Sequence, residues 1–236
     1  STIILAAGKG TRMKTTLPKM LHKIANLEML NHVLNTSKML SSVETIVVVS
    51  EENKEQLKKA AKLDNITYTI QKELSGTGTA VKAGVEALTK DTEYTLIMYS
   101  DECLILDTTY QNLIDKTIEN NVDINVLGFH TRDIKNKYGR LITSTDNELF
   151  AIVEYKDGTD EQRNITLCNS GIMFLRTKYL KELLEKVQPS KVSGEYYLTD
   201  IIKLAMEKDL KCSYAVSDED EVMGVNSQEE LSIAEK

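Results

Sequence analysis

The sequence predicts an α/β fold built on a doubly wound, mostly parallel sheet, with a small β-rich part in its second half. Three observations predict it. Short apolar runs of strand length alternate with stretches of helical periodicity through the first hundred residues. These runs are almost continuously hydrophobic, as in strands covered on both faces. Polar residues follow directly after the runs, at the strand ends where open α/β sheets bind ligands.

In the first half of the chain, four strands alternate with helices. The strands are expected at Ile3–Ala7, Thr45–Ser50, Ile66–Gln71 and Tyr94–Tyr99. The helices are expected around Met20–Leu40, at 51–62, and from Gly76 through Leu88. This alternation places parallel strands side by side with helices on the faces of the sheet.

The second half is richer in strands and is interrupted by a polar, insertion-like segment, Asp157–Asn164. Strands are expected at Ile124–His130, Gly139–Ser144, Phe150–Tyr155, Asn169–Leu175, Tyr214–Val216 and Val222–Val225. Helices are expected at Lys178–Lys186, from near Tyr197, and at the end of the chain. No repeat, low-complexity tract or linker is evident, so a single domain is the economical interpretation.

The composition describes an acidic protein with one sizeable core. Of the 236 residues, 41% are hydrophobic and 28% are charged, and the formal net charge is −7. Nucleic-acid binding is disfavoured, because no broad basic stripe appears beyond the first nineteen residues and scattered helical lysines. No apolar run approaches the roughly 18 residues of a membrane span, and no signal peptide is recognised. We expect a cytoplasmic protein without membrane contact; self-association is not readable from the sequence.

Neither the cysteines nor the histidines form a recognisable site. The cysteines are Cys103, Cys168 and Cys212, which are odd in number and widely spaced, so reduced thiols are expected. The histidines are His22, His32 and His130, which fit no metal-ligand spacing. His22 and His32 are expected on the helix after the first loop, in structural roles.

The most informative segment follows the first strand and reads Leu-Ala-Ala-Gly-Lys-Gly-Thr-Arg-Met-Lys-Thr-Thr-Leu-Pro-Lys over residues 5–19. Gly8 and Gly10 allow positive φ and bring backbone N–H groups close to a polyanion. Lys9, Arg12 and Lys19 place three cations around this turn. A strand that delivers a glycine-rich turn into a helix is a general phosphate-binding arrangement. Gly-Lys-Gly-Thr-Arg alone is also typical of a basic surface turn.

Two better-known glycine motifs do not fit. The dinucleotide fingerprint requires a third glycine where Met13 stands, and the P-loop requires a different spacing.

The full string over residues 5–19, which ends in Leu-Pro-Lys, resembles the signature of the sugar-1-phosphate nucleotidyltransferases. Within them it is most similar to the uridyltransferase domain of the bacterial N-acetylglucosamine-1-phosphate uridyltransferases. The resemblance spans nearly the whole chain and implies a Rossmann-like nucleotidyltransferase domain over 1–236, with a nucleotide-binding half, 1–110, and a sugar-binding half, 111–236.

The resemblance also implies which residues bind the nucleotide. They are Leu5, Ala6, Ala7, Gly8, Lys9, Gly10, Gln71, Gly76 and Thr77. Gln71 opens the uracil-reading segment, and its amide both donates and accepts hydrogen bonds, which suits the edge of a pyrimidine. Gly-Thr-Gly by itself is an ordinary turn. Arg12 and Lys19 are implied to be the catalytic cations.

A magnesium site is implied by two segments far apart in the chain. Asp101 follows an apolar strand and Asn226 ends Gly-Val-Asn, and in the family these residues bind Mg²⁺. One carboxylate and one amide oxygen suit Mg²⁺, which keeps several waters and takes further ligands from phosphates. Without the resemblance, Asp101 is equally well explained as a helix N-cap.

The resemblance places a sugar pocket in the second half. The implied sugar-binding residues are Tyr99, Gly139, Glu154, Asn169, Tyr197 and Thr199. Glu154 is implied to accept hydrogen bonds from sugar hydroxyls, and Asn169 to read the sugar and its N-acetyl group. Each segment alone could be an ordinary turn or solvated charge; their order along the chain carries the match.

The implied reaction joins UTP and N-acetylglucosamine 1-phosphate to give UDP-N-acetylglucosamine and pyrophosphate. Two alternatives stay open: a nucleotidyltransferase for another sugar or alcohol phosphate, and a nucleotide-sugar binding module with little turnover. The family enzyme usually carries a second, acetyltransferase half, and these 236 residues contain no hexapeptide repeat of that kind.

The chain departs from the family pattern at three positions. Ser100 and Cys103 replace a Gly and a Pro beside Asp101, and Thr79 replaces a His after the Gly-Thr-Gly segment. A side chain at Ser100 could crowd the ligand, donate a hydrogen bond to it, or point away from it.

Overall fold

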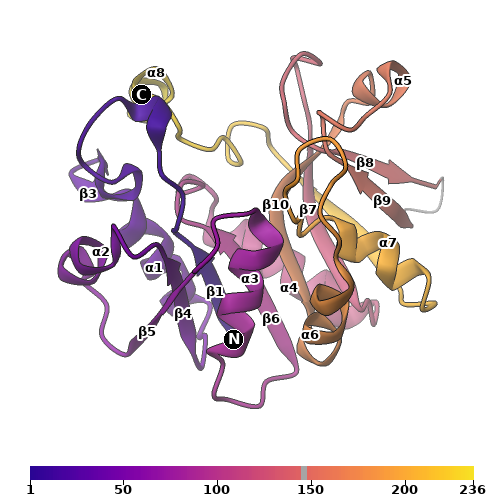
Figure 1. The fold of residues 1–236 in the computed structure, drawn as a ribbon, viewed down its shortest axis with the longest axis horizontal. Coiled ribbons are helices and arrows are strands. Elements are labelled where there is room, and N and C mark those ends of the chain that lie inside the picture. Colours follow the sequence, from indigo (N-terminus) through magenta and orange to yellow (C-terminus); the bar gives the residue numbers. More distant parts are fainter. Residues whose placement is uncertain (145–147) are drawn as a thin grey trace.

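The computed structural model describes residues 1–144 and 148–236. Within these residues, nine strands form one sheet in the order β11-β7-β10-β6-β1-β4-β5, with β8 beside β10 and β9 beside β8 (Figure 1). The strands are β1 Thr2–Leu5, β4 Thr45–Val49, β5 Ile66–Ile70, β6 Tyr94–Tyr99, β7 Ile124–His130, β8 Arg140–Thr143, β9 Leu149–Val153, β10 Leu167–Arg176 and β11 Cys212–Ser217. A separate hairpin pairs β2, Lys23–Ile24, with β3, Leu27–Glu28.

The sheet is mostly parallel, as the sequence predicts. Strand β1 pairs in parallel with both β4 and β6, β4 with β5, and β7 with β11. The exception is β10, which runs antiparallel to both β6 and β7 and joins the two halves of the chain in one sheet. Every residue of β1 and β4 is buried, which explains why these runs are continuously apolar.

Helices cover both faces of the sheet. They are α1 Met29–Met39, α2 Lys54–Ala60, α3 Thr77–Glu86, α4 Asp107–Glu119, α5 Asp160–Arg163, α6 Thr177–Lys186, α7 Asp200–Met206 and α8 Gln228–Ala234, with short 3₁₀ turns η1 Thr11–Met13 and η2 Lys19–Leu21. The two faces of the sheet carry two separate hydrophobic clusters. Alternate residues of β1 belong to different clusters, because successive side chains of a strand point to opposite faces. Ile3 packs in the cluster that includes residues of α3, α6 and α7, and Ile4 in the cluster with α1, α2 and α4.

The topology of the sheet predicts a ligand site at the carboxyl end of β1. From β1 the chain runs to β4 and β5 on one side and then crosses to β6 on the other side. A ligand crevice forms where the strand order reverses in this way, outside the carboxyl ends of the strands. The segments that follow β1 and β6 are the glycine-rich loop and Ser100–Asp101.

The last segment of the chain returns to the first half. Val225 packs with Ile24 and Met29, and Leu231 of α8 lies against this small cluster. In Figure 1, α8 lies on the same side of the molecule as β3 and α2. This return brings Asn226 to the glycine-rich loop.

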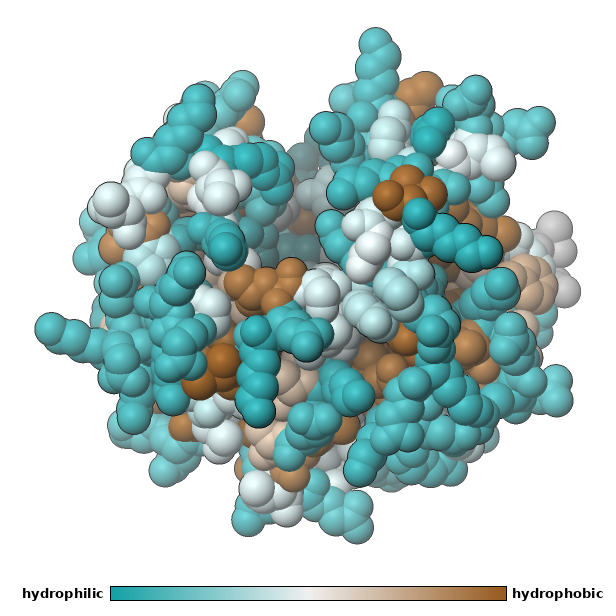
Figure 2. Space-filling model, in the orientation of Figure 1, coloured by the Kyte–Doolittle hydropathy of each residue, from teal (hydrophilic) through white to brown (hydrophobic). Residues whose placement is uncertain are grey.

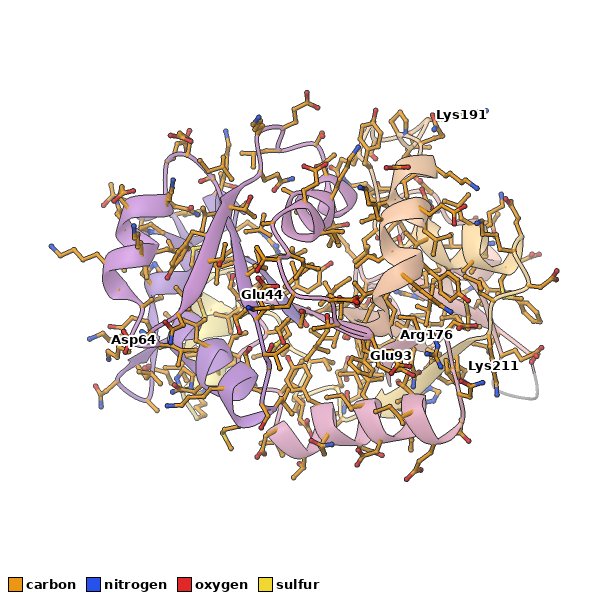
Figure 3. All side chains as sticks on the ribbon, turned by 90° about the horizontal axis from the view of Figure 1, so that it is seen from below. Glu44, Asp64, Glu93, Arg176, Lys191 and Lys211 are labelled. Carbon is orange, nitrogen blue, oxygen red and sulfur yellow. The ribbon has the colours of Figure 1, made fainter. Side chains whose placement is uncertain are left out.

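At the edge of the sheet opposite to Asp101, the last residue of β10, Arg176, forms a cluster of ion pairs. Its guanidinium pairs with Glu93 and with Asp123, and Figure 3 shows Glu93 and Arg176 side by side. It also lies 5.0 Å from the Tyr94 ring centroid. Because β10 and β6 are antiparallel, this cluster lies at the end of β6 away from Asp101.

Three sequence-based expectations about the elements are wrong. The helix expected around Met20–Leu40 is divided into η2, the β2–β3 hairpin and α1, because Ala25 and Asn26 take positive φ, at 49° and 64°. The strand expected at Val222–Val225 is an irregular segment. Helix α4 was not expected from the sequence, and it supplies Tyr110 and Leu113 to the core.

The helical position expected for two histidines is correct for His32 and wrong for His22. His22 lies in extended backbone after η2, not on a helix, and His32 on α1 contacts the carbonyl of Ile24 at 2.9 Å. No helix among the described residues is long and apolar enough to cross a membrane.

The close packing of α3 on β1 generates a stability prediction. A Cβ at Gly84 would lie 2.5 Å from Cγ2 of Ile3 and 3.2 Å from Cγ2 of Val48. We expect Gly84→Ala to lower the free energy of unfolding by about 1–2 kcal/mol, because overpacking outweighs the gain of about 1 kcal/mol in helix propensity. Urea unfolding measures the change.

Gly158→Ala is the matched control, since the nearest atoms to its added Cβ lie at 3.6 Å. We expect a change within roughly 0.5 kcal/mol for the control. An equally stable Gly84→Ala protein would show that α3 can shift on the sheet.

Candidate active site

A cavity of about 400 Å³ opens at the carboxyl ends of β1 and β6. Figure 2 shows the molecule hollowed between two lobes, with hydrophilic side chains on both rims. The cavity is lined by Leu5, Ala7, Gly8, Lys9, Lys19, Met20, Gln71, Leu74, Gly76, Thr77, Ala80, Tyr99, Ser100, Asp101 and Glu195. The residues that the resemblance assigns to the nucleotide therefore meet at the edge of the sheet where the topology predicts a ligand.

Not every predicted nucleotide residue lines this cavity. Ala6 is 1% exposed and packs in the core. Arg12 lies exposed on η1 and makes no hydrogen bond or ion pair within the described residues. Gly10 has φ 60°, and a Cβ there would lie 2.6 Å from the Lys19 Cβ, so this glycine allows the loop to pass close to Lys19. The catalytic role of Arg12 stays a prediction.

Lys19, Asp101 and Asn226 form the centre of the site. The Lys19 ammonium donates to Asp101 Oδ2 at 2.6 Å and to Asn226 Oδ1 at 2.8 Å. The side chains of Lys19 and Asp101 are only 11% and 15% exposed, so this ion pair is largely removed from water. The structure thus brings together the predicted catalytic lysine and both predicted metal ligands.

The same arrangement fits a divalent cation. Two oxygen atoms from distant segments converge on one point, which the Lys19 ammonium occupies, and hard oxygen donors are what Mg²⁺ prefers. Within residues 1–144 and 148–236, no group of three or more His, Cys, Asp or Glu side chains could hold a metal ion. Asp101 and Asn226 would be the two protein ligands. Mg²⁺ that is bound together with a nucleotide usually has only one or two protein ligands.

Glu102 is a buried carboxyl beside this centre that sequence reasoning did not assign. It is 6% exposed, and its Oε2 has no hydrogen-bond partner in the described chain. Burial, with a smaller effect of the Asp101 charge, raises the pKa of Glu102 well above its ordinary value, whereas the Lys19 charge lowers it. In the sequence, Glu102 is an acidic residue next to Asp101, and such a residue is expected to be exposed. The burial of its side chain is seen only in the structure.

Ser100, one of the departures from the family pattern, turns toward β1. It is 1% exposed, and its hydroxyl donates to the carbonyl of Leu5 at 2.9 Å. Of the three interpretations of this side chain, the geometry favours the one in which it points away from the ligand.

The turn that holds Gly76 is clamped by the opposite half of the chain. The amide of Gly78 donates to the carbonyl of Tyr196 at 2.8 Å, and the amide of Tyr196 donates to the carbonyl of Ser75 at 2.7 Å. A Cβ at Gly76 would lie 2.4 Å from the Tyr196 carbonyl oxygen, and Gly76 has φ 126°, so only glycine fits. The hydroxyl of Thr77 also accepts from the amide of Leu198 at 3.0 Å.

The predicted sugar residues form a second group in the other half. Thr199 donates to Glu154 Oε1 at 2.8 Å, and burial raises the pKa of Glu154. The amide of Asn169 donates to the carbonyl of Gly139 at 2.9 Å, while Asn169 Oδ1 accepts from the amide of Gly171 at 3.0 Å. The side-chain NH₂ of Asn169 is thereby left as a donor.

Two tyrosines complete this group. Tyr197 donates to the Ser193 hydroxyl at 2.6 Å. The ring of Tyr99 packs against Gly171, where a Cβ would come within 2.8 Å of it, and Tyr99 also lines the cavity at the ends of β1 and β6. Tyr99 therefore connects the two groups.

Arg140 is a structural residue of the site that the sequence did not single out, although it directly follows Gly139. It is 1% exposed, and its acceptors are the carbonyls of Ile134, Asn136, Tyr138 and Arg163 and the side-chain oxygen of Asn136. Its guanidinium and that of Arg163 lie 5.5 and 5.3 Å from the centroid of the Tyr155 ring. This cluster positions Gly139 and the segment that follows Glu154.

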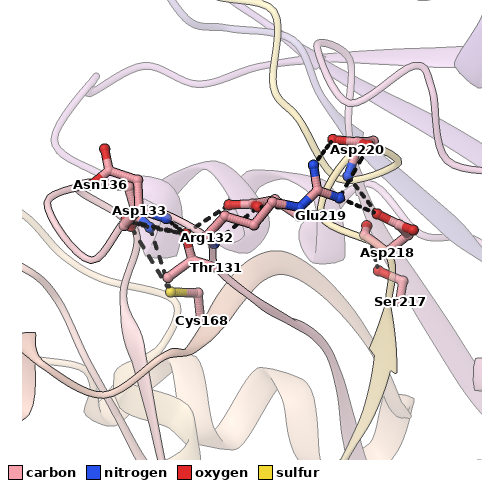
Figure 4. Close-up of polar contacts among 9 residues, drawn as sticks. All are labelled: Thr131, Arg132, Asp133, Asn136, Cys168, Ser217, Asp218, Glu219 and Asp220. Carbon is pink, nitrogen blue, oxygen red and sulfur yellow. Dashed lines mark hydrogen bonds and ion pairs between the residues drawn. The ribbon is translucent and has the colours of Figure 1, made fainter.

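A neighbouring polar network ties the loop after β7 to the segment that leads to Asn226 (Figure 4). Arg132 pairs with Asp218 and Asp220, and Thr131 donates to Glu219 Oε1 at 2.7 Å. Asn136 donates to the Thr131 hydroxyl, which links this network to Arg140. The exposed ion pairs contribute little individually, so the ordering effect comes from their number.

The chain is similar to known proteins over most of its length. A family model described as nucleotidyl transferase matches residues 1–221. The bifunctional protein GlmU of Cereibacter sphaeroides is 39% identical over 237 residues, which cover 100% of this chain and 51% of that protein. GlmU of Clostridioides difficile is 40% identical over 99% of this chain and 50% of its own length. The chain spans about half the length of these curated relatives.

Two solved structures share the fold. A UDP-glucose pyrophosphorylase complexed with UDP-glucose superposes with a TM-score of 0.80 at 17% identity, covering 99% of this chain and 96% of that one. A 4-diphosphocytidyl-2C-methyl-D-erythritol synthase from Anaerococcus prevotii gives 0.69 at 18% identity, covering 99% and 95%. The Rossmann-like fold predicted from the sequence is confirmed.

The raised pKa of Glu102 generates a prediction about stability and pH. Above the unfolded-state pKa near 4.5, the unfolded chain ionises this group while the folded protein keeps it protonated, so it reduces stability as the pH rises toward the folded-state value. Glu102→Gln removes this effect. We expect the stability of the variant to exceed that of wild type by an amount that grows as the pH rises above 4.5.

Urea unfolding of both proteins at pH 5.5 and 7.5, without divalent ions, measures the difference. A difference that is the same at both pH values would mean that Glu102 ionises normally in the folded protein.

Proposed function

The chain belongs to the nucleotidyl transferase family, and from this we propose that it transfers a uridylyl group from UTP to N-acetylglucosamine 1-phosphate. The products are UDP-N-acetylglucosamine and pyrophosphate. The relatives named GlmU, at about 40% identity over the whole chain, support the proposal.

One observation carries the proposal. A single cavity is lined by the glycine-rich loop, by Lys19 with Asp101, and by Gln71, while Glu154 and Asn169 form a group on the other side of Tyr99. The site thus offers an amide for the base, cations and loop amides for phosphates, and a carboxylate for sugar hydroxyls. These are the three kinds of group that a nucleotide sugar carries.

The reaction needs no covalent intermediate on the protein. An oxygen of the sugar phosphate attacks the α-phosphorus of UTP, the bond to the β-phosphate breaks, and pyrophosphate leaves with the electron pair. The attacking phosphate is already an anion, so no general base is required, and repulsion between the two anions is the obstacle. Positioning and charge neutralisation therefore supply the catalysis.

The residues of the chain have distinct tasks in this proposal. Lys19 neutralises the attacking phosphate and the α-phosphate, and the backbone amides of the loop from Gly8 to Gly10, with Arg12, hold the β- and γ-phosphates. Gln71 contacts the uracil. Glu154 accepts hydrogen bonds from sugar hydroxyls, and the free NH₂ of Asn169 donates to the acetamido carbonyl.

We propose Mg²⁺ as the cofactor, held by Asp101 and Asn226. When bound, the ion neutralises charge that develops on the phosphates and orients the leaving pyrophosphate.

Pyrophosphate release from UTP with Mg²⁺ and a panel of acceptors tests the function. The panel is N-acetylglucosamine 1-phosphate, glucose 1-phosphate and a phosphorylated polyol such as methylerythritol phosphate. Preference for the first acceptor supports the proposal, and preference for another corrects the substrate. No release with any acceptor would favour a nucleotide-sugar binding module.

The carboxylate of Asp101 is expected to be essential for turnover. Asp101→Asn keeps an oxygen that can accept from Lys19 but removes the negative charge, so we expect pyrophosphate release to fall by about 10²-fold or more with little loss of thermal stability. Normal turnover of this variant at low Mg²⁺ concentration would show that another group binds the ion.

Lys19 and the divalent cation should compete for one position. The ammonium lies within 2.8 Å of both oxygens, so an ion about 2.1 Å from each would overlap with it. We expect Lys19→Ala to tighten Mn²⁺ binding to the nucleotide-free protein by at least about tenfold, although it lowers turnover.

Electron paramagnetic resonance of free Mn²⁺ measures this affinity. Lys9→Ala is the matched control, because Lys9 lines the same cavity without a contact to Asp101 or Asn226. Unchanged or weaker Mn²⁺ binding in Lys19→Ala would exclude a shared position.

A further inference from the structure

We propose that Thr79 determines which pyrimidine the site accepts, by fixing the orientation of the Gln71 side-chain amide so that it presents only an acceptor. The proposal rests on the proposed function, in which Gln71 contacts the base, and adds a specificity-determining residue to it. Thr79 is half-buried near the start of α3 and is absent from the residues that line the cavity. It would act through Gln71, as a positioning residue.

The two hydrogens of the Gln71 NH₂ group are both used inside the protein. Nε2 donates to the carbonyl of Gly76 at 2.9 Å and to the hydroxyl oxygen of Thr79 at 2.9 Å. The Gly76 carbonyl can only accept, which decides which end of the amide points toward the turn. A flipped amide would place two carbonyl oxygens against each other.

The Thr79 hydroxyl is held in the accepting role toward Gln71 by its other neighbours. It lies 3.1 Å from the carbonyl of Glu73 and 3.0 Å from the carbonyl of Gly76, and both are acceptors only. Its single hydrogen is directed at these carbonyls. Its lone pair is therefore what faces the amide of Gln71.

What remains available on Gln71 is its carbonyl oxygen. Gln71 lines the cavity and is 7% exposed. Within the described residues Oε1 has no hydrogen-bond partner, and it is not among the fully enclosed polar atoms that lack one. The accessible atom of this side chain is thus an acceptor that opens on the cavity.

An acceptor at this place distinguishes the two common pyrimidines. With Gln71 Oε1 opposite N3 of the base, uracil donates its N3 hydrogen to Gln71, whereas N3 of cytosine is itself an acceptor and faces Oε1 with a lone pair. A polar contact left unsatisfied in this way disfavours the wrong base. Without the Thr79 oxygen, only the hydrogen bond to the Gly76 carbonyl opposes rotation of the amide, and a rotated amide presents its NH₂ group to cytosine.

The test compares UTP and CTP as substrates of wild type and Thr79→Val, which is isosteric but lacks the hydroxyl. We expect the ratio of kcat/KM for UTP over that for CTP to fall by about tenfold in Thr79→Val, the scale of one hydrogen bond. Thr79→Ser restores the hydroxyl and should keep the ratio within about twofold of wild type. Thr79→Ala serves as a second variant should the valine protein fail to fold.

Thr67→Val is the matched control, since Thr67 is exposed on β5. A purely structural role of Thr79 would lower the values for both nucleotides together and leave their ratio unchanged, and that result would overturn the proposal. Loss of the ratio in Thr79→Ser as well would also overturn it.

Calorimetric Kd values for UTP and CTP without an acceptor separate this proposal from the proposed function. If wild type binds UTP more tightly than CTP but releases no pyrophosphate, the function fails while the Kd ratio of Thr79→Val still decides the role of Thr79. If wild type binds neither nucleotide, both proposals fail.

Discussion

The contact on which the site depends is the Lys19 ammonium held between Asp101 and Asn226. It joins three segments that the sequence keeps far apart: the glycine-rich loop after β1, the end of β6, and the returning segment before α8. A largely buried carboxylate without a cation would carry a large desolvation penalty, so this lysine stabilises the arrangement as well as supplying charge. The point between the two oxygens attracts a cation, whether an ammonium or a metal ion.

The position of that contact follows from the sheet. Strand β1 lies between β4 and β6, and both neighbours run parallel to it, so the loops after β1 and β6 leave the same edge side by side. Antiparallel β10 then adds the second half of the chain to the same sheet and places Asn169 near that edge. The clamp between Tyr196 and the turn at Gly76 closes the arrangement across the cleft. A continuous apolar sheet thus carries a polar site without burying the site's own charges in the core.

Much of this could be predicted from the sequence, because the strongest signals are local. Four largely apolar strands, the glycine-rich loop and the position of Asp101 after a strand all depend on neighbouring residues, and the structure agrees with each. The helix expected around Met20–Leu40 was wrong for a local reason that periodicity does not reveal, the positive φ of Ala25 and Asn26. Helix α4 was missed because its apolar face is narrow, with Tyr110, Leu113 and Thr117 as its buried residues. The Lys19–Asn226 contact and the burial of Glu102 depend on chain return, which no local pattern contains.

The departures from the family pattern show how a site tolerates changed side chains. Ser100 and Thr79 each introduce a hydroxyl beside the cavity, and each directs its single hydrogen to a backbone carbonyl, of Leu5 for Ser100 and of Glu73 or Gly76 for Thr79. A hydroxyl that donates its only hydrogen to a carbonyl can only accept hydrogen bonds from its remaining neighbours. For Ser100 the bonded carbonyl belongs to β1, so the hydroxyl joins the strand ends. For Thr79 the neighbours that donate to its oxygen are the Ser75 hydroxyl and the amide of Gln71, which lines the cavity. The two hydroxyls thus differ in what lies on the far side of the oxygen, and the specificity that we propose for Thr79 depends on that difference.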